Sequence, residues 1–234
     1  MNRPVPPARI GLLAAALAVL ILAPSTALAH GVAHGDQLFI ENSAGSQIVP
    51  FIYLGAKHMV TGYDHLLFLV GVIFFLYRMK EVAVYVSLFA VGHSATLLYG
   101  VLSGTNVNPY IVDAIIGFSV VYKGLDNMGA FQRWFGFQPN TKAAVLIFGL
   151  FHGFGLATKL QDFALSKDGL VGNILAFNVG VEIGQFLALG MVLIGMGYWR
   201  RTAAFGRHAF AANAALIVAG LALVVYQTNG FLNS

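Results

Sequence analysis

Six apolar windows, each close to the length that crosses a lipid bilayer, dominate the sequence. A helix needs about 20 mostly apolar residues to span the hydrocarbon core of a bilayer. Backbone groups within lipid must bond to one another, and these runs are too long for barrel strands, so we expect an all-α protein. The windows cover residues 49–77, 82–102, 108–124, 142–159, 170–198 and 208–227.

The composition also indicates a chain that lies in a membrane. Hydrophobic residues make up 58% of the sequence and charged residues only 9%, whereas a soluble domain is about half apolar and a quarter charged. This balance excludes a disordered chain, a coiled coil and a nucleic-acid-binding protein. The sequence contains no Cys, which excludes a disulfide framework, a thiolate metal site and a Cys nucleophile.

The first 29 residues have the three parts of a secretory signal peptide. Arg3 and Arg9 form a positive n-region, residues 10–22 form a small and apolar run, and Ala27-Leu28-Ala29 is an A-x-A cleavage signal. We therefore expect cleavage after Ala29, with a retained transmembrane anchor as the alternative. The parts that follow are a polar periplasmic segment at 30–48, a six-helix transmembrane domain at 49–227 and a short periplasmic tail at 228–234.

After cleavage, the mature chain begins with a segment that contains His30 and His34. An N-terminal His chelates metal ions through its amine and its imidazole, which makes both residues candidates for external metal capture. Two His in a polar tail also occur without any metal role, and the sequence leaves both interpretations open.

Positive charge is concentrated on one side of the expected membrane. The loops after the first, third and fifth windows hold eight Lys or Arg residues, whereas the other side holds only Lys159 and Lys167. The positive-inside rule therefore places both ends of the mature chain outside, and a signal peptide requires the same orientation. We expect a multi-pass protein of a bacterial inner membrane, N-out and C-out. The eight residues are Arg78, Lys80, Lys123, Arg133, Lys142, Arg200, Arg201 and Arg207.

Polar residues within the windows recur at helical spacing. Ionisable side chains at such depth are costly and usually functional. In the fifth window, Asn178, Glu182 and Gln185 share one helix face, and Gly180 and Gly184 lie on the opposite face, which suits close helix contact. Five polar residues of the first window fall within an arc of about 120° at 100° per residue. They are Lys57, His58, Thr61, Asp64 and His65.

Five ionisable residues from four windows lie near the centres of their spans, which predicts one shared site. Imidazole suits Zn, Ni, Co, Cu and Fe, and carboxylates add negative charge, so the site suits a divalent metal ion. His58 lies in the outer half of its window and is a further candidate ligand on the access route. The central residues are Asp64, His65, His93, His152 and Glu182. The residues expected to orient these ligands are Thr61, Ser94, Asp113, Asn178 and Gln185.

Structural roles are alternatives for several of these residues. A lone membrane His, such as His58, often only packs and forms hydrogen bonds. Asp64 has a possible ion-pair partner in Lys57, and a protonated Glu182 has a hydrogen-bond partner in Asn178. A network that serves structure alone is therefore the competing interpretation.

Four blocks of the sequence resemble the HupE/UreJ family of membrane proteins. They occur in the family's order, and the resemblance extends from about residue 49 to 225. It implies a nickel or related divalent-cation permease, associated in some members with hydrogenase or urease maturation. The first block has DHLLF rather than DHLLAM, as in the less characterised branch, and Asp113 stands where that branch usually has Glu. The blocks are His58-x5-Asp64-His65-Leu66-Leu67-Phe68, His93-Ser94-x-Thr96-Leu97, Phe148-Gly149-Leu150-Phe151-His152-Gly153 and Phe177-Asn178-x3-Glu182-x2-Gln185.

Transport is the function that these features favour, because a central cation site reached first from one side and then from the other suits a secondary transporter. Nickel or cobalt is the expected cargo, with zinc, iron and copper as alternatives; the absence of Cys disfavours Cu(I). The competing functions are an intramembrane metal- or haem-dependent enzyme and a non-transporting assembly factor for an envelope metalloenzyme. No HExxH motif supports the enzyme. The expected partners are the bilayer, the metal ion and a maturation protein, with the oligomeric state left open.

Overall fold

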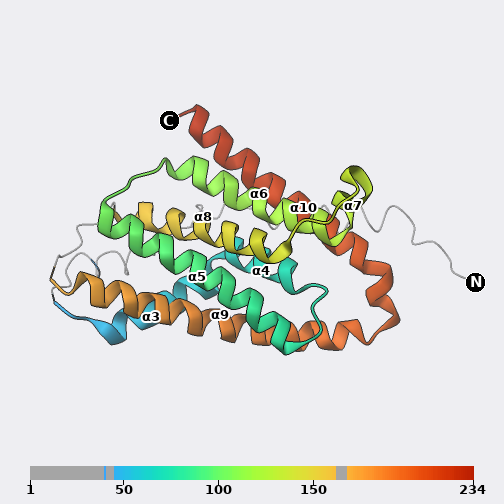
Figure 1. The fold of residues 1–234 in the computed structure, drawn as a ribbon, viewed down its shortest axis with the longest axis horizontal. Coiled ribbons are helices and arrows are strands. Elements are labelled where there is room, and N and C mark those ends of the chain that lie inside the picture. The colour runs from blue at the N-terminus through green and yellow to red at the C-terminus, as the bar shows by residue number, and fades with distance from the viewer. Residues whose placement is uncertain (1–39, 41–44, 162–167) are drawn as a thin grey trace, which may run out of the picture.

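The computed structural model describes residues 40, 45–161 and 168–234. This part of the chain is helical and contains no strand, which confirms the all-α prediction (Figure 1). The predicted signal peptide, His30 and His34 lie outside the described residues. The helices are α3 (Ile48–Thr61), α4 (Tyr63–Ile73), α5 (Met79–Ser103), α6 (Pro109–Asn127), α7 (Ala130–Phe135), α8 (Thr141–Gln161), α9 (Leu170–Arg200) and α10 (Ala203–Leu232).

Four of these helices are long and apolar enough to cross a membrane: α5, α8, α9 and α10. Helix α6 has 19 residues, but it carries the charged residues Asp113, Lys123 and Asp126. Helices α3 and α4 have 14 and 11 residues, so neither reaches the length of a span alone. The count of six spans therefore stays a prediction from the sequence.

The first predicted window is divided into two helices. Helix α3 ends at Thr61, Gly62 is extended, with φ −76° and ψ 92°, and α4 begins at Tyr63. A Cβ at Gly62 would lie 3.1 Å from both the His58 carbonyl oxygen and His65 Nδ1, so a side chain there would require both groups to shift by a few tenths of an ångström. The prediction that the polar residues of this window share one continuous helix face is therefore wrong.

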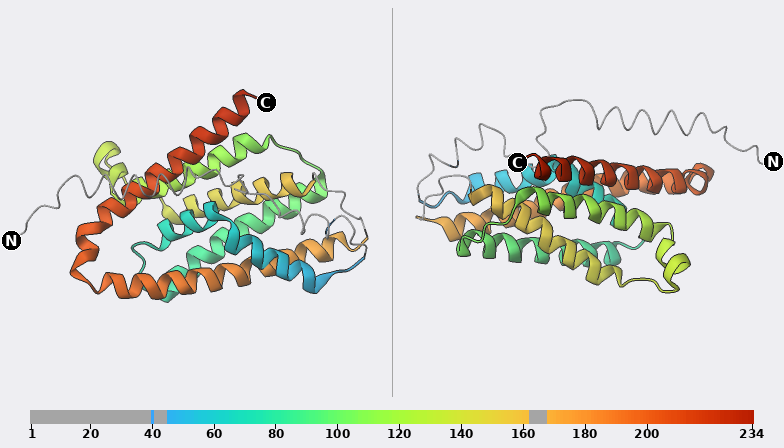
Figure 2. Two further views of the ribbon diagram at one scale, coloured as in Figure 1. Left: turned by 180° about the vertical axis from the view of Figure 1, so that it is seen from behind. Right: turned by 90° about the horizontal axis from the view of Figure 1, so that it is seen from above.

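The long helices pack mainly in three pairs, α5 with α8, α3 with α9 and α6 with α10 (Figures 1 and 2). The first two pairs run parallel and the third runs antiparallel, as the order of their contacts shows. The chain divides into two halves, α3 to α6 and α8 to α10. When each span of one half is replaced by the equivalent span of the other, the α5–α8 pair becomes the α3–α9 pair, and the α6–α10 pair becomes itself. Helix pairs that correspond in this way are the contact pattern expected of an inverted repeat.

Glycines bring all three pairs into backbone contact, and α3–α9 and α5–α8 are examples. A Cβ at Gly184 of α9 would lie 2.6 Å from the Ala56 carbonyl oxygen of α3. A Cβ at Gly149 of α8 would lie 2.6 Å from the Phe89 carbonyl oxygen of α5. The prediction of close helix contact at Gly184 is thus confirmed, and the main chains of these pairs are held at a fixed spacing.

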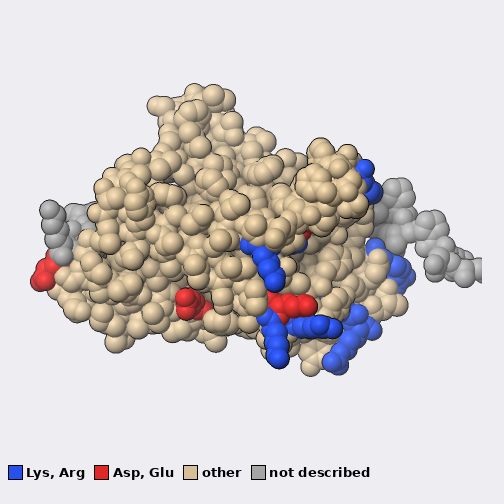
Figure 3. Space-filling model, in the orientation of Figure 1, with Lys and Arg blue, Asp and Glu red and all other residues tan. Residues whose placement is uncertain are grey.

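Exposed Lys and Arg side chains gather at one end of the bundle (Figure 3). We call it the basic end: α4, α6 and α9 end there, and α5, α8 and α10 begin there (Figure 1). Two of the residues that the sequence analysis counted with the loops lie in helices instead. Lys123 is buried in α6 and pairs with Asp126. Arg200, at the end of α9, donates hydrogen bonds to the carbonyl oxygens of Ile73, Phe74 and Leu76. Arg200 thereby ties the end of α9 to the end of α4.

Candidate metal centre

Four histidines from four helices meet in the middle of the bundle. His65 of α4 is central: its ring centroid lies 5.2 Å from that of His58, 5.5 Å from that of His93 and 4.7 Å from that of His152. His65, His93 and His152 are fully buried. The Gly62 break positions His58 and His65 on separate helices, so that their rings meet edge to face.

Two groups of potential ligand atoms share His65. His58, His65 and His93 form one triplet, and Asp64, His65 and His152 form the other. Within each triplet the ligand atoms lie within 4.8 Å of one another. Imidazole nitrogens with a carboxylate oxygen are a donor set for divalent nickel, cobalt, zinc, iron or copper.

Hydrogen bonds orient two of the rings. His152 Nδ1 lies 2.7 Å from the Phe148 carbonyl oxygen; because a carbonyl only accepts, Nδ1 carries the proton and Nε2 is left to bind a metal ion. His65 Nδ1 lies 3.0 Å from Asp64 Oδ1, the carboxylate–histidine arrangement that fixes metal-binding rings.

Several ring nitrogens in the cluster lack a hydrogen-bond partner among the described residues. They are His58 Nε2, His152 Nε2 and both ring nitrogens of His93, all of them buried. Buried polar atoms in folded proteins nearly always have a partner. A metal ion bound in either triplet would supply the missing interaction to the histidines of that triplet.

A layer of phenylalanines closes the cluster toward the basic end. Phe68, Phe89 and Phe148 each lie about one helical turn from a cluster histidine in that direction. The Phe68 centroid lies 5.7 Å from that of Phe89 and 5.6 Å from that of Phe148. All three side chains are buried. The cluster is therefore separated from the basic end by apolar rings, and we call these residues the aromatic layer.

Glu182 lies away from the cluster, contrary to the prediction of a shared site. Its side chain is exposed on α9, although Asn178 and Gln185, which were predicted to share its face, are buried. The sequence predicts how deep Glu182 lies in its span, but depth does not determine whether its side chain faces the interior of the bundle. The structure thus brings together His58, Asp64, His65, His93 and His152 but not Glu182.

The residues predicted to orient the ligands have other contacts. Thr61 is exposed, and its hydroxyl donates to the Lys57 carbonyl oxygen of its own helix at 2.9 Å. Gln185 is buried and donates to the Val86 carbonyl oxygen of α5 at 3.4 Å. Ser94 is half-buried and Asn178 is buried. Asp113 forms an ion pair with Lys159.

Sequence reasoning missed Lys159 and the aromatic layer. Lys159 follows His152 by seven residues, which is the same helix face two turns later. That spacing is visible in the sequence. Phe68, Phe89 and Phe148 also stand three or four residues from a central histidine, but apolar residues at helical spacing carry no signal of their own in a membrane protein.

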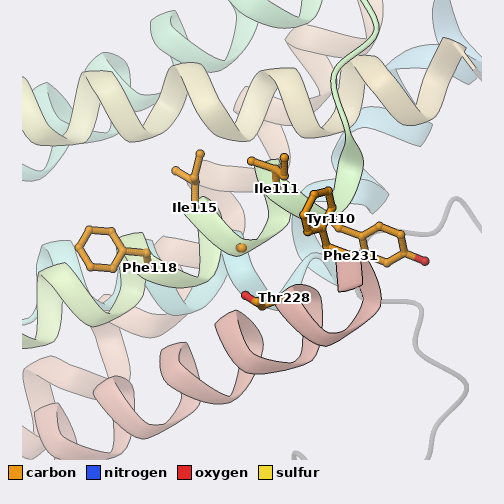
Figure 4. A pocket seen from close by; sticks show the side chains of 7 residues that line it. Tyr110, Ile111, Ile115, Phe118, Thr228 and Phe231 are labelled. Carbon is orange, nitrogen blue, oxygen red and sulfur yellow. The ribbon is translucent and has the colours of Figure 1, made fainter. Parts of the chain in front are cut away.

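A groove on the surface of the bundle is unrelated to the cluster. It lies between α6 and α10, where Ile111, Phe118 and Phe231 are exposed (Figure 4). Tyr110, Ile115 and Thr228 complete the labelled lining. None of these residues belongs to either triplet. Apolar surface of this kind is what a membrane helix presents to lipid.

Asp64→Asn tests the role of the carboxylate. The amide keeps the size of the side chain but loses the negative charge that orients His65 and attracts a cation. We expect the affinity for Ni²⁺ or Co²⁺ to fall by about 10- to 100-fold, the range for groups that orient metal-binding histidines. Isothermal titration of purified protein measures this. An unchanged dissociation constant would contradict a role for Asp64 in metal binding.

The fold and the cluster together define a helical membrane protein with a buried His/Asp site suited to a metal ion. The family model described as HupE / UreJ protein matches residues 34–234. The chain belongs to the HupE/UreJ family. Membership indicates a membrane protein that handles nickel or cobalt, in a family whose members are generally not enzymes. No curated protein and no solved structure matched the chain.

Proposed function

We propose that this protein is a divalent transition-metal permease of a bacterial inner membrane, with nickel or cobalt as its cargo. The observation that carries the proposal is the buried cluster in which several histidine nitrogens lack a partner among the described residues. Such a cluster at the centre of a bundle is costly to keep in lipid without a function. Family membership points to the same class of ion.

His65 offers a route through the site, because it belongs to both triplets. A cation bound by His58, His65 and His93 reaches Asp64 and His152 without leaving His65. One ligand is kept while others are exchanged, so the ion need never be fully released. A broken helix at the centre of the bundle, such as the one at Gly62, is also typical of transporter binding sites.

The interchange of the helix pairs supports alternating access. Transporters with inverted repeats bind their cargo where the two halves meet and open by rocking one half against the other. Here His58, His65 and His93 come from one half and His152 from the other. The aromatic layer separates the cluster from the basic end, which supports entry of ions from the opposite end.

Uptake into proteoliposomes tests the proposal. Purified protein is reconstituted, an inside-negative potential is imposed, and influx of Ni²⁺, Co²⁺, Zn²⁺, Fe²⁺ and Mn²⁺ is measured. The potential favours influx by about 2.3 kcal/mol per charge per 100 mV. We expect influx of Ni²⁺ or Co²⁺ that His152→Ala abolishes and His208→Ala, in the exposed start of α10, leaves intact.

Two other outcomes have distinct meanings. Metal binding without influx would contradict a permease and favour an assembly factor, because such a protein needs the same site but no flux. Folded protein that binds none of these ions would contradict both functions.

A further inference from the structure

A buried ion pair and a neighbouring amide join three helices beside the histidine cluster. Asp113 of α6 accepts hydrogen bonds at Oδ2 from Lys159 Nζ of α8 at 2.9 Å and from Gln227 Nε2 of α10 at 3.3 Å. Asp113 and Gln227 are 7% and 6% exposed, whereas the Lys159 side chain is 19% exposed. The lysine is therefore the member of the network with the largest exposed fraction.

This network lies close to the cluster, on the side away from the aromatic layer. A Cβ at Gly155, three residues after His152, would lie 3.5 Å from Asp113 Oδ1. An ion that approaches the cluster from this side meets Asp113 before it meets His152.

Stability alone does not explain why this network is charged. Exchange of the two halves relates the Asp113 network to a second network at the basic end. There Asn127 of α6 donates to the carbonyl oxygen of Gly71 in α4 and to Asn213 Oδ1 in α10, both at 2.8 Å. There the corresponding three helices are joined by amides and a carbonyl. A buried ion pair stabilises a fold little more than uncharged packing does.

We propose that Asp113 is a cation-binding group through which the divalent ion reaches the histidine cluster, and that Lys159 is a displaceable ammonium that occupies this group between ions. The proposal rests on the metal-permease function proposed above. Lysine suits the role because its charge is on a flexible four-carbon stem. Lys159 is two residues from the end of α8, so its ammonium can extend to the membrane surface while the stem stays in the bundle.

Charge balance favours the exchange. Asp64 and Asp113 carry two negative charges between them, which equals the charge of one divalent ion. With the Lys159 ammonium in place, an arriving ion is repelled; with the ammonium displaced, both carboxylates are available to it. Gln227 adds a side-chain amide, which contains both a donor and an acceptor, so it can turn from Asp113 to offer its oxygen to the ion.

The rate at which Co²⁺ associates with the purified full-length protein tests this. Cobalt is the probe because its visible absorption reports coordination, and stopped-flow mixing gives the rate constant. We expect Lys159→Met to raise the association rate constant about tenfold, the lower end of electrostatic effects on such rates. Asp113→Asn should lower it, and the double variant should behave like Asp113→Asn, because Lys159 acts through Asp113. Lys142→Met, in the exposed first turn of α8, is the matched control and should be unchanged.

The alternatives give different results. A purely structural pair predicts a lower melting temperature in both single variants, recovery in the double variant, and no gain in rate with Lys159→Met. Lys159→Gln keeps a hydrogen-bond donor without the charge; it should also show the faster association, which covers the case in which Lys159→Met fails to fold. An unchanged rate in folded Lys159 variants overturns this inference alone, because the parent still binds and transports metal. A parent that binds no Co²⁺ overturns the permease and this inference together.

Discussion

Replacing His65 by Ala will abolish high-affinity binding of Ni²⁺ or Co²⁺ to the purified protein. His65 is the one residue that belongs to both ligand triplets among the described residues, so its loss leaves neither triplet intact. Removal of a group that merely orients a metal-binding histidine weakens binding by about 10- to 100-fold. Loss of a shared ligand should therefore exceed 100-fold, and equilibrium dialysis of protein against radioactive Ni²⁺ measures it.

His58→Ala supplies the internal comparison. It removes one ligand from one triplet and leaves Asp64, His65 and His152 in place, so its effect should be smaller than that of His65→Ala. His208→Ala should bind like the parent. Equal losses in His65→Ala and His208→Ala would show that binding occurs outside the cluster.

Gly153→Ala is expected to separate α5 from α8 and to impair metal binding without removing any ligand. The added Cβ would collide with the His93 carbonyl oxygen and with Thr96 Oγ1. The Thr96 hydroxyl also donates to the Leu150 carbonyl oxygen of α8 at 2.6 Å, so the two helices are tightly joined at this level. Overpacking of this kind destabilises a protein by about 1–3 kcal/mol.

The measurement is a thermal unfolding curve in detergent together with a metal titration. Gly190→Ala of α9 is the matched control, because a Cβ there has nothing within 4 Å; it should leave the melting temperature unchanged or raise it slightly, since Ala restricts the unfolded chain. A Gly153→Ala protein with parental melting temperature and affinity would show that helix spacing at His93 and His152 is not critical.

The sequence predicts the positions of helices well where a helix is defined by the length of apolar sequence needed to cross a bilayer. The window 82–102 corresponds to α5 at Met79–Ser103, and 142–159 corresponds to α8 at Thr141–Gln161. The prediction for window 49–77 was less accurate, because this window does not form a single helix. Its hydropathy is continuous, but the structure divides it at Gly62 into two helices, and hydropathy carries no signal of such a break.

The histidines of the site could be located from their depth in the spans. Imidazole rings near the centre of three apolar windows have few polar neighbours other than one another. Glu182 had the same depth, but its side chain is exposed while Asn178 and Gln185 are buried, a difference that helical spacing alone does not predict. Lys159 was treated only as a loop charge, because its pairing with Asp113 depends on how α8 lies against α6.

For the proposed permease, the interchange of helix pairs bears on how the resting populations of two access states would be set. Exchange of the halves restores the three main helix pairs, so we expect these pairs to contribute similarly to both states, whereas the contacts of α6 with α4 and α8 are not matched. The populations then depend on the side chains that the exchange does not match, chiefly the Asp113–Lys159 pair at one end and the Asn127–Asn213 amides at the other. A change of about 1.4 kcal/mol in either network shifts the ratio of the two states tenfold. The direction in which the empty protein faces is therefore adjustable by single substitutions far from the metal ligands.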